Sequence, residues 1–149
     1  MRKQQSGHII QVSSILGITT LPNLGLYNAS KFAVEGLTET LSQEVKQFGI
    51  NVTLLEPNGY ATDIWGNGFN SESIDAYDGI KKAIVDGHDP DTFGKISGTV
   101  PAVIKLVEAK NPPLRLFLGK VALPFAKQTY EQKIATWEEW ADVSVAAHG

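Results

Sequence analysis

The feature that most constrains this chain is an alternation of short β-branched runs with longer amphipathic segments. Residues 8–13 and 51–55 are short runs rich in Ile, Val and Thr, and a third apolar run spans 114–118. The segment 26–48 separates the first two runs and repeats apolar residues at helical spacing, giving one apolar face. Its apolar positions are Leu26, Ala29, Ala33, Val34, Leu37, Leu41, Val45 and Phe48. Strands joined by helices pair in parallel through right-handed crossovers, so the sequence predicts an α/β fold with a parallel sheet of about three strands and flanking helices.

Turn-forming residues separate the other predicted helices from one another. Helices are predicted over 72–86, 99–110 and 124–141, with Gly-, Pro- and Asn-rich loops between them. Gly49 stands where a left-handed residue would close the helix of 26–48. Thr99 stands where a hydroxyl would cap the helix of 99–110.

Composition and charge exclude several classes of function. The chain has 149 residues, 13 Lys plus Arg against 16 Asp plus Glu, and no cysteine. Scattered charges of both signs do not favour a nucleic-acid partner, and the absence of cysteine excludes disulfides and thiol chemistry. The three histidines do not stand at metal-ligand spacing, so no metal site is expected. No run of about 18 apolar residues predicts a membrane span, and the first apolar run is too short for a signal peptide, so we expect a cytoplasmic chain without a membrane partner.

Two segments follow strands and are expected to lie at the same edge of the sheet. Ser13 and Ser14 follow the first strand, and residues 57–62 follow the second. Open α/β sheets bind ligands at the carboxyl ends of their strands. These two segments are therefore the candidate ligand-binding side.

Tyr27 and Lys31 form the sharpest local pattern. Residues four apart lie on one helical face, and an ammonium near a phenol favours the phenolate, which helps the hydroxyl to carry a proton. A second pair, Tyr77 and Lys81, has the same spacing. Only the first pair follows a hydroxyl at a strand end, because Ser14 precedes Tyr27 by 13 residues.

Three motifs in order make the chain resemble the short-chain dehydrogenase/reductase family. Residues 7–17 match Gly-x-Ile-x-x-x-Ser-Ser-x-x-Gly, residues 27–31 match Tyr-x-Ala/Ser-Ser-Lys, and residues 57–62 match the Pro-Gly-x-x-x-Thr turn. Their agreement in order, spacing and context is far more specific than any one motif. The clear resemblance covers residues 7–64, and Asn58 departs from it at a position where the family usually has glycine.

The resemblance implies a Rossmann-like, doubly wound sheet and an NAD(P)-dependent transfer of hydride between a carbonyl and an alcohol. Tyr27 would be the general acid/base at the substrate oxygen, and Ser14 would hydrogen-bond that same oxygen. Lys31 would hold the nicotinamide ribose and assist Tyr27. The cofactor-binding positions implied are Tyr27, Lys31, Pro57, Asn58, Gly59, Tyr60 and Thr62. The partners implied are a small carbonyl or alcohol substrate, NAD or NADP without a readable preference, and a second copy of the chain through the helix of 26–48.

The nucleotide-binding half of the family pattern is not found in the printed sequence. No strand is followed by the Thr-Gly-x-x-x-Gly-x-Gly turn that holds the pyrophosphate. We therefore expect residues 1–149 to be the C-terminal catalytic part of a single Rossmann-like domain, with weak or no dinucleotide binding by this chain alone. The alternative is a non-catalytic fragment that acts as a helix-mediated interaction module or needs a missing N-terminal half.

Overall fold

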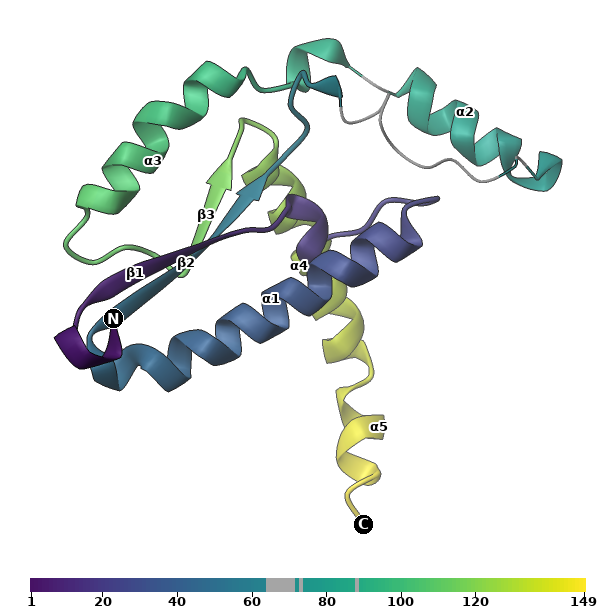
Figure 1. The fold of residues 1–149 in the computed structure, drawn as a ribbon. Helices are drawn as coiled ribbons and strands as arrows, with labels where there is room; N and C mark the ends of the chain where they lie inside the picture. The colour runs from purple at the N-terminus through teal and green to yellow at the C-terminus, as the bar shows by residue number, and fades with distance from the viewer. Residues whose placement is uncertain (64–71, 73, 88) are drawn as a thin grey trace.

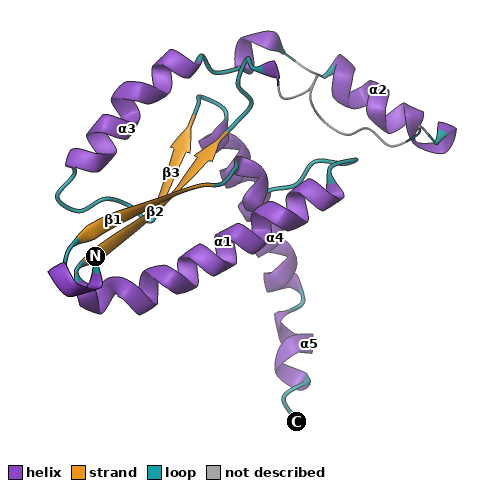
Figure 2. Cartoon of the chain, in the orientation of Figure 1, coloured by secondary structure: helices purple, strands orange, loops and turns teal. Residues whose placement is uncertain are grey.

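A three-stranded parallel sheet forms the centre of the fold (Figures 1 and 2). The computed structural model of the chain describes residues 1–63, 72, 74–87 and 89–149. Within that part, β1 (Gly7–Val12) pairs with β2 (Ile50–Pro57), and β2 pairs with β3 (Arg115–Leu118). All the pairings are parallel, which confirms the predicted α/β sheet with flanking helices.

Five helices and several short 3₁₀ turns connect and flank the described strands. The α-helices are α1 (Gly25–Val45), α2 (Asp78–Asp86), α3 (Thr99–Glu108), α4 (Ala122–Glu139) and α5 (Ala141–Ala146). The 3₁₀ turns are η1 (Arg2–Gln4), η2 (Ile15–Gly17), η3 (Lys46–Phe48), η5 (Asp75–Tyr77), η6 (Pro90–Thr92) and η7 (Ile96–Gly98). Gly49 has a φ of 65°, so the predicted left-handed residue does follow α1 and η3. Thr99 is not the N-cap of α3: Gly98 holds that position, and the Thr99 hydroxyl donates to the Ile96 carbonyl at 2.7 Å.

The two faces of the sheet are covered by different helices. Side chains alternate between the two faces of a strand. In β2, Leu55 packs with Leu106 of α3, whereas Glu56 points to the opposite face and lies 3.2 Å from the Arg115 guanidinium. Figure 1 shows α3 on one side of the sheet and α1 on the other. This alternation brings the end of β2 into contact with both helices.

The most buried residues of α1 are polar, which the apolar spacing in the sequence did not predict. Its buried residues are Asn28, Glu35 and Thr38, while Leu26 is 92% exposed and Leu37 is 72% exposed. The apolar residues of the helix are divided between exposed positions and half-buried ones such as Val34 and Leu41. On the inward side, Asn28 donates to the Leu21 carbonyl and Glu35 pairs with Arg115, although one oxygen of each side chain has no hydrogen-bond partner.

The helix α4 packs against the η2 segment and carries the chain away from the sheet. Ala122 and Ala126 contact the buried cluster of Ile15, Leu16 and Ile18. Lys133 donates to the Ile18 carbonyl at 3.2 Å. The later turns and α5 extend away from the sheet in Figure 1, and Trp137 and Trp140 are largely exposed. Among the described residues, none of the helices is long and apolar enough to cross a membrane.

Candidate active site

Ser14 is held at the carboxyl end of β1 by a short 3₁₀ turn. The backbone N–H of Ser13 still donates to the Leu55 carbonyl at 2.8 Å, so the pairing with β2 continues one residue past the strand. Ser14 has extended backbone angles and caps η2, with its hydroxyl oxygen accepting from the Leu16 N–H at 3.1 Å. The residue is buried, at 6% exposure. Its hydroxyl proton is not used by that contact and is free to be donated elsewhere.

The first turns of α1 bring Tyr27 and Lys31 to the same end of the sheet. The Lys31 ammonium lies 5.8 Å from the centre of the Tyr27 ring. It also donates a long hydrogen bond, 3.5 Å, to the carbonyl of Val12 at the end of β1. Asn28 fixes this part of the helix, because its side-chain amide donates to the Leu21 carbonyl at 3.0 Å. Lys31 therefore links the Tyr27 ring to the strand end that precedes Ser14.

The turn after β2 is fastened to two other segments. The N–H of Asn58 donates to the Leu118 carbonyl at 2.9 Å, and its side-chain amide donates to the Thr92 carbonyl at 3.0 Å. The backbone N–H of Gly94 also donates to the Gly59 carbonyl, at 2.9 Å. A Cβ atom at Gly94 would stand 2.6 Å from the Tyr60 ring, so a glycine is required for this close approach. The turn is thus tied to the end of β3 and to the segment 92–94.

A hollow of about 260 Å³ opens at the carboxyl ends of all three strands. It is lined by Val12, Leu55, Pro57, Tyr60, Thr62, Ile96, Thr99, Val103 and Leu118. Burial raises the pKa of Tyr60, so this phenol stays neutral at physiological pH and keeps a proton that it can donate to a ligand. The hollow therefore has apolar walls with a few hydroxyl groups.

The structure brings together most, but not all, of the residues expected in the cofactor turn. Pro57, Tyr60 and Thr62 line the hollow. Asn58 and Gly59 are not part of that lining, since Asn58 is buried against its partners and Gly59 packs under the Phe93 ring.

The sequence analysis missed the wall contributed by η7 and α3, where Ile96, Thr99 and Val103 face the hollow. A pattern read along the chain carries no signal for this contact between distant segments.

The second Tyr-x-x-x-Lys pair does not resemble the first in its surroundings. Tyr77 lies at the end of η5, half exposed, and Lys81 pairs with Asp78 at 3.7 Å.

The residues present fit the nicotinamide end of a dinucleotide. A flat ring that carries an amide suits apolar walls with hydroxyl donors, and the hollow lies where open α/β sheets bind ligands. Thr62 provides a hydroxyl and Val12, Pro57 and Val103 provide walls.

Comparison with known proteins agrees with this geometry. The model of the short chain dehydrogenase family matches residues 1–73. Oxidoreductase BOA17 of Botryotinia fuckeliana is 35% identical over 153 residues, which cover 99% of this chain and 55% of that protein. A short-chain dehydrogenase from Streptomyces avermitilis superposes with a TM-score of 0.84 at 32% identity, over 99% of this chain and 55% of that one. The chain belongs to the short-chain dehydrogenase/reductase family.

More distant members of the family share the fold. A short chain dehydrogenase from Burkholderia cenocepacia in complex with NADP gives a TM-score of 0.64 at 21% identity, covering 92% of this chain and 48% of that one. A Burkholderia phymatum dehydrogenase in complex with NAD gives 0.67 at 20% identity, covering 91% and 51%. The chain thus spans about half the length of the family members it matches.

Proposed function

We propose that this chain carries the catalytic residues of an NAD(P)-dependent oxidoreductase that interconverts a carbonyl and an alcohol. The observation that carries the proposal is the position of Lys31, which contacts both the Tyr27 ring and the end of β1. It supports a site in which the Tyr27 phenol and the Lys31 ammonium act together with the Ser14 hydroxyl, which follows the same strand end. The family membership and the neighbouring hollow support the same chemistry, and they favour it over a non-catalytic interaction module.

Each of the three side chains has a distinct task in the proposed reaction. The Tyr27 hydroxyl gives its proton to the substrate oxygen in reduction and takes it back in oxidation. The positive charge of Lys31 stabilises the phenolate that remains after the proton has left. The Ser14 hydroxyl donates to the same substrate oxygen and stabilises the charge that develops on it.

The hollow at the strand ends is the proposed place of the nicotinamide, which supplies or accepts the hydride when it is bound. Thr62 would bind the carboxamide, and Lys31 together with Tyr27 would hold the ribose. Pro57 and Tyr60 would bound the ring, while Asn58 and Gly59 would shape the backbone of the turn. No described residue distinguishes NAD from NADP, so the proposal covers both.

The proposed partners are a small carbonyl or alcohol substrate and a second copy of the chain. The outward side of α1 carries exposed apolar side chains, including Leu26 and Leu37. An apolar helix face of this kind favours a homo-oligomer that pairs through α1.

Tyr27→Phe tests the proposal, with Tyr77→Phe as the matched control. Carbonyl reduction is measured with NADH and NADPH in the protein at its full natural length, against a panel of aldehydes and ketones. We expect Tyr27→Phe to lower kcat by about 10²–10⁴-fold, because the variant cannot transfer the proton. Tyr77→Phe should retain the activity, since the same spacing there lacks the strand-end hydroxyl. Equal activity of the two variants would show that Tyr27 is not the proton carrier.

A further inference from the structure

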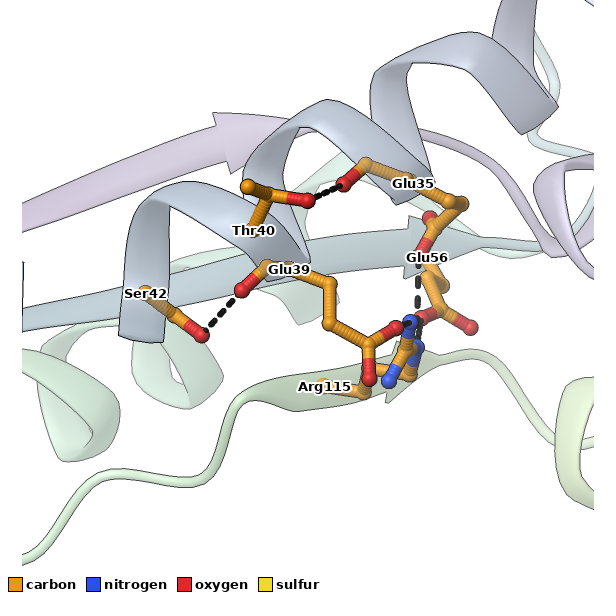
Figure 3. A network of polar contacts seen from close by, with 7 residues as sticks. Glu35, Glu39, Thr40, Ser42, Glu56 and Arg115 are labelled. Atoms are coloured by element: carbon orange, nitrogen blue, oxygen red, sulfur yellow. Dashed lines mark hydrogen bonds and ion pairs between the residues drawn. The ribbon is translucent and has the colours of Figure 1, made fainter. Parts of the chain in front are cut away.

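A partly buried charge cluster lies between α1, the end of β2 and the start of β3 (Figure 3). Arg115 lies at its centre, 3.2 Å from a Glu35 oxygen, 2.7 Å from a Glu39 oxygen and 3.2 Å from a Glu56 oxygen. Glu56 is fully buried and Glu35 is 4% exposed. Glu39 is at the solvent-facing rim, with 47% of its side chain exposed. One guanidinium thus faces three carboxyl groups, and two of these groups are buried.

The charges in this cluster do not balance if every carboxyl group is ionised. Lys127 and Tyr130 of α4 line the same hollow as Glu39 and Arg115. In the described part of the chain, no ion pair joins Lys127 to these carboxyl groups. Three negative charges would then share one positive charge, and two of them would be buried. Burial of an uncompensated carboxylate is costly, so such a group takes up a proton instead.

The carboxyl oxygens that lack a hydrogen-bond partner independently indicate that one of these groups is protonated. Glu35 Oε1 and both carboxyl oxygens of Glu56 are buried and lack a hydrogen-bond donor. Carboxylate oxygens only accept hydrogen bonds, whereas a protonated carboxyl also donates one. A proton held between the two groups would engage one oxygen of each in a hydrogen bond, and so reduce the number of unpartnered oxygens from three to one.

The surrounding backbone holds Glu35 in this place. A Cβ atom at Gly17 would stand 2.8 Å from both the Glu35 Cγ and the Ser13 Oγ, so η2 packs directly on the Glu35 side chain. Glu35 has little room to turn away from Glu56 and Arg115.

We propose that Glu35 and Glu56 share a single proton in the folded protein, and that this pair is a positioning device for α1. Glu35 lies one helical turn after Lys31, and Glu56 directly precedes Pro57. The pair joins the helix that carries Tyr27 and Lys31 to the strand that leads into the cofactor turn. Its importance for catalysis rests on the function proposed above, whereas the shared proton does not.

The acidity of Glu56 supports the proposal. Burial, and then the negative charge of Glu35, raise the pKa of Glu56 to about 8 against the opposing effect of Arg115. The folded chain therefore keeps a proton that the unfolded chain releases near pH 4.5. The stabilisation that this proton provides is complete below about pH 4.5 and is lost as the pH rises through 8.

Infrared difference spectroscopy of the 149-residue chain tests the shared proton directly. We expect the carbonyl stretching band of a protonated carboxyl group at pH 7, and we expect it to disappear as the pH rises through about 8. Glu56→Gln should remove this band, while Glu39→Gln, which alters the exposed partner of the same arginine, should retain it. If the wild-type chain shows no such band at pH 7, the shared proton does not exist. If Glu56→Gln does not fold, Glu35→Gln serves in its place and should move the titration of the band to lower pH.

Hydrogen exchange of the α1 amides tests the positioning role in the same samples. Wild-type α1 should be better protected at pH 6 than at pH 9, after correction for the intrinsic effect of pH on exchange. Glu56→Gln is neutral at every pH, so it should abolish most of this difference, and Glu39→Gln should preserve it. An unchanged difference in Glu56→Gln would overturn the positioning role. Both measurements need no enzymatic activity, so failure of the proposed function would leave their outcome intact.

Discussion

Single polar side chains decide the shape of the candidate site at the residue scale. Asn58 occupies a position where the resemblance led us to expect glycine, and its structural use explains the exchange. Its amide donates to the carbonyls of Gly59 and Thr92, and it lies so close to Gly119 that a Cβ there would coincide with the amide oxygen. Gly119 also has a φ of 109°, which other residues rarely adopt. Asn58 lacks the backbone freedom of a glycine, but its side chain holds the turn in place through these hydrogen bonds.

Replacement of Asn58 by alanine should destabilise the fold by about 1–3 kcal/mol, because two part-buried hydrogen bonds, to the carbonyls of Gly59 and Thr92, are lost. Urea unfolding measures the difference. Asn111→Ala, at an exposed bend, is the matched control and should change the stability by less than about 0.5 kcal/mol. Equal effects of the two variants would mean that the Asn58 hydrogen bonds contribute little.

At the element scale, α1 shows that the spacing of apolar residues can predict a helix without predicting its most buried residues. The spacing of its apolar residues predicted the helix, but not that Asn28, Glu35 and Thr38 would face the sheet. Periodicity reports that a helix has two different sides. Which side is buried depends on the partners, and Arg115 comes from a strand far away in the sequence.

Gly36 gives a test of which side of α1 is covered. A Cβ at this position would meet nothing within 4 Å in the described structure, although the residue lies inside the helix. Gly36→Ala should therefore stabilise the monomeric chain by about 1 kcal/mol, since alanine favours the helix more than glycine does. Ala33→Gly, at another exposed position of α1, should lower the stability by a similar amount. Thermal unfolding at low protein concentration compares the two, and a destabilised Gly36→Ala monomer would contradict the open surface seen here.

The whole molecule leaves much of its apolar surface uncovered. The described part of β1 pairs with β2 only, so one edge of the sheet is open, and Val12 is 57% exposed. Leu26 and Leu37 add to this surface on the outward side of α1. Open strand edges and apolar helix faces both promote association between chains.

We expect the 149-residue chain to self-associate through the outward side of α1. The double variant Leu26→Glu/Leu37→Glu should weaken this association by at least about tenfold, because charges would replace two exposed leucines that association would bury. Val100→Glu/Val107→Glu places the same charges at exposed positions on α3 and is the matched control. Sedimentation velocity over a range of concentrations gives the association constants. A monodisperse wild-type monomer at all concentrations would refute the expectation.

The sequence alone was sufficient for the order and type of the principal elements, the parallel sheet, and the presence of Ser14, Tyr27, Lys31 and Thr62 near strand ends. These features depend on local periodicity, turn chemistry and short motifs, which neighbouring residues encode together. Only the tertiary structure showed the polar inner side of α1, the wall that η7 and α3 give to the hollow, and the cluster around Arg115. Those features arise where segments far apart in the sequence meet, and burial, which no local pattern records, then decides which charges must be paired and which must take up a proton.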